Sequence, residues 1–404
     1  MQGRRAFVKS VGAGLALAGG AWMAPRRSRA AGLPQGAVDA AVLDALPGKR
    51  ALIRHSLRPP NYETPLEAFD SILTSNDRFF VRWHLGNIPQ VDPHAWRLAI
   101  GGDAVERPLQ LTLDQLKQEF EPAELVAVCQ CAGNRRGLSD PHVPGVEWGY
   151  GAMGNARWKG ARLKDVLARA APRGTALEVA FDGADEPAIE RTPDFVKSVP
   201  LWKAQDENTL IAYEMNGEAL PHWNGFPARI VVPGWTATYW VKQVTAVNVL
   251  SAPQGGFWMS TAYRIPKRKF PVIDRFVSQE TAETMPITEM VVNSLITNLA
   301  DGQKFRKGSP IAIRGLAWDG GYGIRSVEVS TDDGRSWQTA ELVSDLGRYS
   351  FVSWQHAFVP PEAGTYAVLA KATNRQGASQ TFELIFNPAG YHNNVVQRIQ
   401  IQVG

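Results

Sequence analysis

The sequence predicts an α+β fold in two domains, a mixed N-terminal domain followed by an immunoglobulin-like β-sandwich. The chain has 404 residues, which exceeds one ordinary hydrophobic core. Helix-type and strand-type segments mix from residue 79 to about 270, whereas short alternating segments with regular turns follow from 285. The second pattern is typical of an antiparallel sandwich. We therefore expect a leader at 1–30, a mixed domain at 31–275 and a sandwich at 276–404.

Residues 1–30 have the layout of an export signal. Arg4 and Arg5 open a twin-arginine pattern, an apolar stretch rich in Gly and Ala runs to about Met23, and residues 28–30 supply small residues for cleavage. A membrane anchor would need about 20 strongly apolar residues, and this stretch is shorter. Because the twin-arginine route carries folded proteins, we expect a periplasmic protein with a bound cofactor and no stable membrane insertion.

The basic charge of the chain is concentrated in this leader. The whole chain has 43 Lys and Arg against 39 Asp and Glu, and six of the basic residues lie within 1–30. The remainder has 37 basic against 39 acidic residues, a net charge of −2. Near-neutrality excludes the electrostatic footprint of a nucleic-acid-binding protein.

The first domain is expected to begin irregularly, because prolines interrupt residues 31–75. Local patterns then predict a helix at 112–120, with Thr112 as its N-cap, and a second helix at 163–170. Apolar runs predict strands at 125–128, 229–232 and 239–250. In the sandwich, residues 326–331 and 365–372 alternate as strands, and turns are expected at 332–334 and 374–377.

The strongest chemical signal lies at residues 126–137, Val-Ala-Val-Cys-Gln-Cys-Ala-Gly-Asn-Arg-Arg-Gly. A strand leads Cys131 into a turn of small residues followed by two arginines. Neighbouring cations and backbone N–H groups stabilise a thiolate, and a thiolate is a soft ligand for a transition metal. We interpret Cys129 as a small buried apolar residue. A disulfide between the two would close a strained ring.

A second signal is Phe-Phe-Val-Arg-Trp-His at residues 79–84. If this segment is a strand, Arg82 and His84 point to the same side, which suits an oxyanion. Taken alone, the segment favours an ordinary half-buried strand with Arg82 in an ion pair. Segments 224–234, 239–243 and 255–264 also resemble loops and core strands when each is taken alone.

Together and in this order, the five segments resemble the sulfite oxidase family of molybdenum enzymes, above all its bacterial periplasmic sulfite dehydrogenases. The resemblance extends from about Leu46 to the end. It implies that Cys131 binds molybdenum. It also implies that the molybdopterin cofactor contacts Phe80, Val81, Arg82, Trp83, His84, Asp185, Asn224, Arg229, Lys242, Gln243 and Val244.

The resemblance further implies catalytic roles for Tyr263, Arg82, Arg136 and His84, with Trp148 in the anion pocket. Two positions depart from the family. Asn224 stands where animal members carry histidine. After the Asn-Pro-Ala-Gly-Tyr motif at 387–391, Asn393 replaces an arginine found in many bacterial relatives, so one expected cation is missing.

The implied activity is molybdenum-dependent oxidation of sulfite to sulfate. A haem attachment motif, Cys-x-x-Cys-His, does not occur in the sequence. We therefore expect no haem in this chain and a separate c-type cytochrome as the electron acceptor. The sandwich resembles the family's dimerisation domain, which implies a homodimer, while a heterodimer with a cytochrome subunit is the alternative.

Three other functions fit parts of the pattern. A related molybdenum enzyme could act on another sulfur compound, as a sulfane dehydrogenase does. A methionine sulfoxide reductase also has a cysteine-bound pterin site, but it typically lacks the sandwich. A non-catalytic relative could use Arg82, Arg136 and His84 only to capture an anion.

Overall fold

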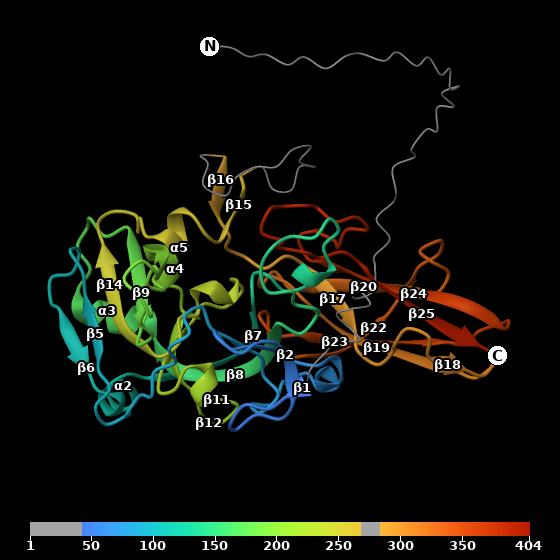
Figure 1. Cartoon of the computed structure of the whole chain (residues 1–404), viewed down its shortest axis with the longest axis horizontal. Coiled ribbons are helices and arrows are strands. Elements are labelled where there is room, and N and C mark those ends of the chain that lie inside the picture. Colours follow the sequence, from blue (N-terminus) through green and yellow to red (C-terminus); the bar gives the residue numbers. More distant parts are fainter. Residues whose placement is uncertain (1–42, 268–282) are drawn as a thin grey trace, which may run out of the picture.

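The computed structural model describes residues 43–267 and 283–404. The expected leader and the expected boundary at 275/276 lie outside these residues. Figure 1 shows two bodies side by side, the N-terminal strands in blue to yellow and the C-terminal strands in orange to red. Strands dominate both bodies, and the longest helix in the described ranges has eight residues. No helix within 43–267 or 283–404 is long and apolar enough to span a bilayer.

A small antiparallel sheet forms the beginning of the described chain. Its strands are β1 (Leu43–Asp44), β2 (Leu52–Ser56), β3 (Asn61–Glu63) and β4 (Val81–Arg82). The expectation of irregular structure before residue 75 is therefore wrong for this part, because a tight turn at 57–60 folds β2 onto β3. The strand expected at 79–84 shortens to two residues, because only β4 pairs with β3.

The second sheet is mixed. Its order is β10 (Lys197–Pro200), β9 (Glu178–Gly183), β14 (Val244–Leu250), β5 (Leu98–Gly101) and β6 (Leu109–Leu111), with β14 and β5 parallel. The strand expected at 239–250 begins only at Val244. A 3-10 turn, η4 (Ala237–Tyr239), precedes it, and Gln243 has a left-handed φ of 47° that breaks the extended run.

The third sheet carries the cysteines. Its order is β12 (Glu218–Ala219), β11 (Leu210–Met215), β8 (Met153–Arg162) and β7 (Pro122–Gln130), and β13 (Arg229–Val231) pairs with β11. The strand expected at 125–128 lies within β7, and that expected at 229–232 coincides with β13. At Gly160, a Cβ would lie 2.1 Å from the carbonyl oxygen of Ile211, so the close pairing of β8 with β11 requires glycine.

Both expected helices of the first domain are confirmed. In α2 (Leu113–Gln118), Thr112 is the N-cap and forms a capping box with Gln115. The helix α3 spans Leu163–Ala170 and buries its apolar face. The remaining helical segments are η1 (Leu66–Phe69), η2 (Arg136–Leu138), α4 (Leu201–Ala204), η3 (His222–Asn224) and α5 (Phe257–Ser260). A two-stranded link, β15 (Arg264–Pro266) with β16 (Thr284–Pro286), leads towards the second body.

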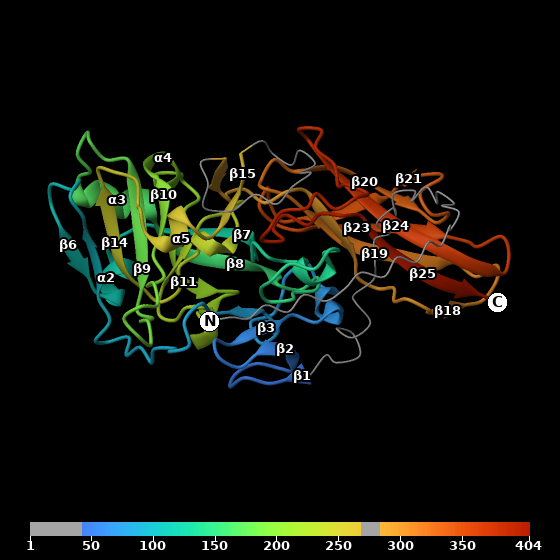
Figure 2. The ribbon, with the colours of Figure 1, turned by 45° about the horizontal axis from the view of Figure 1, so that its top comes forward.

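Two sheets pack face to face in the C-terminal body. One has the order β17 (Asn293–Ile296), β19 (Ile311–Trp318), β23 (Val352–Phe358) and β22 (Glu341–Asp345). The other has the order β18 (Lys304–Phe305), β25 (Gln397–Val403), β24 (Gly364–Asn374), β20 (Ile324–Ser330) and β21 (Gln338–Thr339). A shared apolar core joins them, and Figure 2 shows the two layers. The expected strands and turns of this body are confirmed, while its specifically immunoglobulin-like character stays a prediction.

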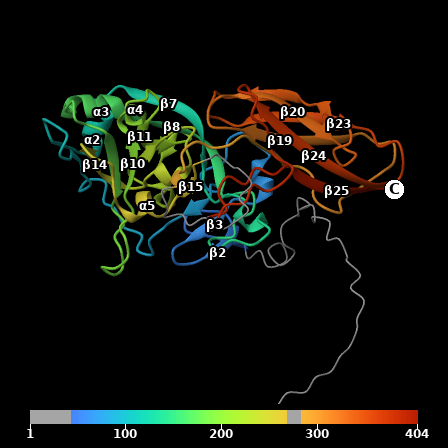
Figure 3. The same ribbon diagram turned by 90° about the horizontal axis from the view of Figure 1, so that it is seen from above.

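The two bodies meet along the strand that leads to Cys131 (Figure 3). Val128 and Met153 share an apolar cluster with Leu295, Trp318 and Phe351 of the C-terminal body. Hydrogen bonds cross the same interface, from Val128 N to Tyr349 O (2.9 Å) and from Trp318 Nε1 to Gln130 Oε1 (2.6 Å). The sandwich therefore supports β7 directly before the cysteine loop.

Candidate active site

Cys131 lies immediately after β7, at the start of a tightly held loop. Its backbone N–H donates to Ala152 O (2.9 Å), and its carbonyl accepts from Asn134 N (3.0 Å). The side chain of Asn134 accepts from Ala152 N (3.0 Å). A Cβ at Gly133 would lie about 2.5 Å from the Arg136 guanidinium, so a larger residue there would displace that guanidinium. The backbone therefore fixes the position of the Cys131 thiol.

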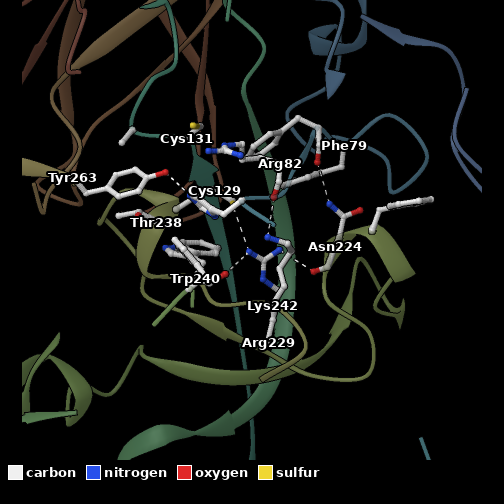
Figure 4. Close-up of a pocket in the computed structure, with 16 residues that line it drawn as sticks. Phe79, Arg82, Cys129, Cys131, Asn224, Arg229, Thr238, Trp240, Lys242 and Tyr263 are labelled. Carbon is white, nitrogen blue, oxygen red and sulfur yellow. Dashed lines mark hydrogen bonds between the residues drawn. The ribbon is translucent and has the colours of Figure 1, made fainter. Parts of the chain in front are cut away.

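Cys131 faces a cavity of about 510 Å³ (Figure 4). Eight of the predicted site residues line it: Phe80, Arg82, His84, Cys131, Asn224, Arg229, Lys242 and Tyr263. The cavity thus gathers side chains from β4, β7, η3, β13 and the segments before β14 and β15. Other lining residues include Phe79, Cys129, Phe195, Thr238 and Trp240.

Other predicted contacts lie beside the cavity. Val81 and Trp83 pack in the apolar cluster under the N-terminal sheet. Gln243 is buried and donates to Pro89 O (3.2 Å), and its carbonyl accepts from Ala184 N (2.9 Å). Asp185 is buried nearby, and burial raises the pKa of its carboxyl group. Val244 begins β14 and belongs to the main core.

The charged residues that line the cavity are the cations Arg82, Arg229 and Lys242, and none of its described lining residues is acidic. Arg229 donates to Asn224 O (2.9 Å) and Trp240 O (3.0 Å). Lys242 donates to Arg82 O (2.8 Å) and lies over the Trp83 ring. Burial, followed by the charge of Arg229, lowers the pKa of Lys242 to about 7. An anionic ligand would relieve this concentration of buried positive charge.

Two buried polar atoms support the same conclusion. Arg229 Nε and Thr238 Oγ1 have no hydrogen-bond partner within the described residues, although buried polar groups normally have one. Both residues line the cavity. A thiol, three cations and unpaired polar atoms therefore fit an anionic pterin cofactor that carries a metal. Cys131 could hold the metal, and Arg229 and Lys242 could balance the negative charge of the cofactor.

Tyr263 and His84 meet across the cavity. The phenol of Tyr263 is hydrogen-bonded to His84 Nε2, and His84 stacks on Phe195 at a centroid distance of 3.6 Å. Burial, then the charges of Arg82, Lys242 and Lys197, lower the pKa of His84 well below its usual value. These surroundings therefore favour the neutral form of the His84 imidazole. Tyr263 is held in an unusual left-handed conformation, with φ of 57°.

Arg136 lies behind the cysteine loop and does not line the cavity. Its Nε donates to Ala389 O (2.7 Å), its Nη1 donates to Val146 O (3.2 Å), and its guanidinium lies over the Tyr391 ring. Tyr391 stacks on Tyr263 at 5.7 Å. Trp148 is fully buried and packs against the ring of His55.

Sequence reasoning missed two features of the site. Cys129 belongs to the apolar core, as expected, but it also lines the cavity. Its Sγ lies 3.9 Å from Arg229 Nη2. Lys49 is buried against Asn224 and was not singled out at all. The i, i+2 spacing of the cysteines was a usable signal for the first. Lys49 lies in a segment whose sequence carries no such signal.

Comparisons with known proteins agree with this geometry. Residues 85–258 match the oxidoreductase molybdopterin binding domain, and residues 284–404 match the Mo-co oxidoreductase dimerisation domain. Sulfite oxidase of Arabidopsis thaliana is 31% identical over 399 residues, covering 89% of this chain and 99% of that protein. Mitochondrial sulfite oxidase of Rattus norvegicus is 36% identical over 370 residues, or 87% of this chain, which spans 66% of the rat protein's length.

A solved structure is also similar. The sulfane dehydrogenase SoxCD from Paracoccus pantotrophus matches with a TM-score of 0.75 and 25% identity, covering 95% of this chain and 93% of that one. Taken together, these matches show that the chain belongs to the sulfite oxidase family of molybdenum oxidoreductases. The family resemblance inferred from the sequence motifs is thereby confirmed.

Proposed function

We propose that this protein is a molybdenum-cofactor enzyme that oxidises sulfite to sulfate and passes the electrons to a c-type cytochrome. One observation carries the proposal: Cys131 faces a cationic, acid-free cavity beside the hydrogen-bonded pair Tyr263 and His84. The relatives named sulfite oxidase support the choice of substrate. The bound cofactor would supply the oxygen-atom transfer and accept two electrons.

The residues of the chain have separate roles in this proposal. Cys131 holds the metal through its thiolate, while Arg229 and Lys242 balance the negative charge of the cofactor. Asn224 orients the cofactor from the opposite wall. Because these groups are already fixed by backbone contacts, little reorganisation is needed on binding.

Arg82 is the residue that would hold the sulfite dianion. Its guanidinium lines the cavity and donates from Nη1 to Asn61 Oδ1 (3.2 Å) and to Trp83 O. Its other nitrogens leave N–H groups for an oxyanion. The overall reaction converts sulfite and water into sulfate, two protons and two electrons. Tyr263 would donate a hydrogen bond to the oxygen undergoing transfer, and neutral His84 would orient that phenol. Arg136 would act from behind the Cys131 loop through Tyr391.

The location and partners belong to the same proposal. The twin-arginine pattern supports export to the periplasm, where a separate c-type cytochrome would collect the electrons. The match of residues 284–404 to a dimerisation domain supports a homodimer. A heterodimer with a cytochrome subunit is the alternative.

A second candidate function is the oxidation of another sulfur compound, such as a sulfane group. The extensive structural likeness to a sulfane dehydrogenase favours it.

Substrate-dependent reduction of cytochrome c by the molybdenum-loaded protein distinguishes these functions. We expect turnover with sulfite and much slower turnover with thiosulfate, a small sulfane compound. The reverse preference would favour the second candidate. Protein that carries no molybdenum after production in cofactor-competent cells would contradict both and leave an anion-binding relative.

A further inference from the structure

Arg135 crosses the interface between the two bodies. Its backbone belongs to the cysteine loop, and its guanidinium lies in the sandwich. Nη1 donates to Asn293 Oδ1 (2.5 Å) in β17, and Nη2 donates to Val395 O (2.6 Å) just before β25. The guanidinium also lies 5.0 Å from the centroid of the Tyr150 ring.

This cation is buried, with 3% of its surface exposed, and neither of its two acceptors is a carboxylate. Burial lowers the pKa of Arg135 from its usual value. An apolar side chain of similar volume would often stabilise such an interface at least as well. Stability alone therefore does not explain an arginine at this position, whereas a directional link between the bodies does.

The backbone of Arg135 is held from the sandwich as well. Its φ is +69°, a left-handed conformation that is uncommon for a residue with a Cβ. Asn393 Nδ2 donates to the Arg135 carbonyl (3.0 Å), which also accepts from Leu138 N (3.1 Å). The Asn393 side chain in turn accepts from Val395 N (3.2 Å). Asn393 thus stabilises the turn that Arg135 makes.

That turn is part of the cysteine loop. Arg135 N donates to Gly149 O (2.8 Å), and the preceding residue, Asn134, donates to Cys131 O (3.0 Å). A movement of Arg135 would therefore be transmitted through one residue to the carbonyl of Cys131. The side chain of Asn134 also accepts from Ala152 N, whose own carbonyl accepts from Cys131 N.

We propose that Arg135 and Asn393 are positioning residues through which the sandwich sets the geometry of the Cys131 loop. The sandwich is then a working part of the active site in addition to any role in dimerisation. The consequence for turnover rests on the proposed function, but the link between the sandwich and the loop does not. Asn393 does not replace a substrate-binding cation in this account; it caps the turn behind the metal ligand.

The test compares Asn393→Ala with Asn394→Ala. Asn394 is a matched control in the same loop, because it donates to Val292 O (3.2 Å) and accepts from Thr381 Oγ1 (3.2 Å), both within the C-terminal body. The measurement is the alkylation rate of each cysteine with iodoacetamide in cofactor-free protein, resolved by peptide mass spectrometry. Cys129, inside β7, serves as the internal reference.

We expect Asn393→Ala to increase the alkylation rate of Cys131 about tenfold, because local opening of the loop controls access to the buried thiol. The rate at Cys129 should not change, and Asn394→Ala should match the wild type at both thiols. Equal Cys131 rates in Asn393→Ala and the wild type would overturn the proposal. Asn393→Ala could unfold and expose both thiols equally, and Arg135→Lys is then the variant to measure. Faster alkylation of Cys131 alone in Arg135→Lys would support the proposal, and unchanged alkylation rates would overturn it.

The loaded protein provides a second readout. The electron paramagnetic resonance spectrum of the partly reduced metal reports the geometry of its thiolate ligand. We expect this spectrum to shift in Asn393→Ala and to stay unchanged in Asn394→Ala. A protein without sulfite turnover would contradict the proposed function and leave the alkylation result valid, so the two failures are distinguishable.

Discussion

The Nζ of Lys49 donates a 2.6 Å hydrogen bond to Oδ1 of Asn224, inside the wall of the candidate active site. The same ammonium group donates to Phe79 O (3.1 Å), and Asn224 in turn donates to Phe80 O (3.1 Å). Lys49 thereby joins the start of the described chain to two segments that line the cavity. The position of Asn224 therefore depends on this lysine.

Lys49→Met should destabilise the protein by about 2–4 kcal/mol, because buried acceptors lose their donor. Burial lowers the pKa of Lys49 from 10.5 to about 7. The folded state therefore binds fewer protons than the unfolded state between these values, and the contribution of Lys49 to stability rises with pH across that window. Urea unfolding at pH 7 and pH 9 measures the free energy of unfolding of both proteins. The wild type should exceed Lys49→Met by more at pH 9 than at pH 7. An equal advantage at both values would contradict this account.

Glu63→Gln should also be strongly destabilising. The buried carboxylate accepts from Gly149 N and Gly151 N (both 2.8 Å) and pairs with His55 Nε2 (2.7 Å). An amide in its place would turn a donor towards one of these N–H groups, at a cost of about 2–4 kcal/mol. Glu362→Gln is the control, because Glu362 pairs with Lys307 at the surface and such pairs contribute little. Similar unfolding midpoints for the two variants would refute the special role of Glu63.

Tyr263→Phe should lower kcat for sulfite by about 10–100-fold, the loss expected for one hydrogen bond to a charged group. Molybdenum content should stay unchanged, because the ring and its stacking on Tyr391 remain. Tyr322→Phe removes a comparable phenol contact, to Glu289 in the sandwich, and should not change kcat. Steady-state kinetics of both variants make the comparison, and equal kcat values would exclude the phenol from the reaction.

Arg82→Lys should raise KM for sulfite by about 10–100-fold, because an ammonium group cannot donate in a planar fork to an oxyanion. Molybdenum content should be retained, since Arg229 and Lys242 still face the cofactor. The measurement is KM at constant metal loading. An unchanged KM with a lower metal content would instead assign Arg82 to cofactor binding.

Local features of the fold were predictable from the sequence. The helix at 163–170 was predictable from its local pattern, and α2 was predictable from its N-cap residue, Thr112. The position of Cys131 at the start of a loop directly after a strand also follows from the local sequence. Each of these signals lies within about ten residues of chain, where propensity and pattern decide the structure.

Features that depend on distant partners were not predictable. The two arginines after Cys131 were expected to stabilise a thiolate, yet the partners of Arg135 lie 158 and 260 residues away, in the sandwich. The strand expected at 239–250 begins only at Val244, because the left-handed Gln243 interrupts the extended run beside Lys242, which lines the cavity. The role of Lys49 was not predictable for the same reason. Its hydrogen bond to Asn224 forms only when η3 folds against the N-terminal segment.

The central claim is that the Cys131 thiolate holds a molybdenum cofactor that oxidises sulfite. The most direct test measures molybdenum content and sulfite-dependent cytochrome c reduction in the wild type, Cys131→Ser and Cys129→Ser. We predict stoichiometric molybdenum and turnover in the wild type, metal retained in Cys129→Ser, and turnover lost in Cys131→Ser. Sulfite turnover that survives in Cys131→Ser at wild-type metal content would contradict the claim.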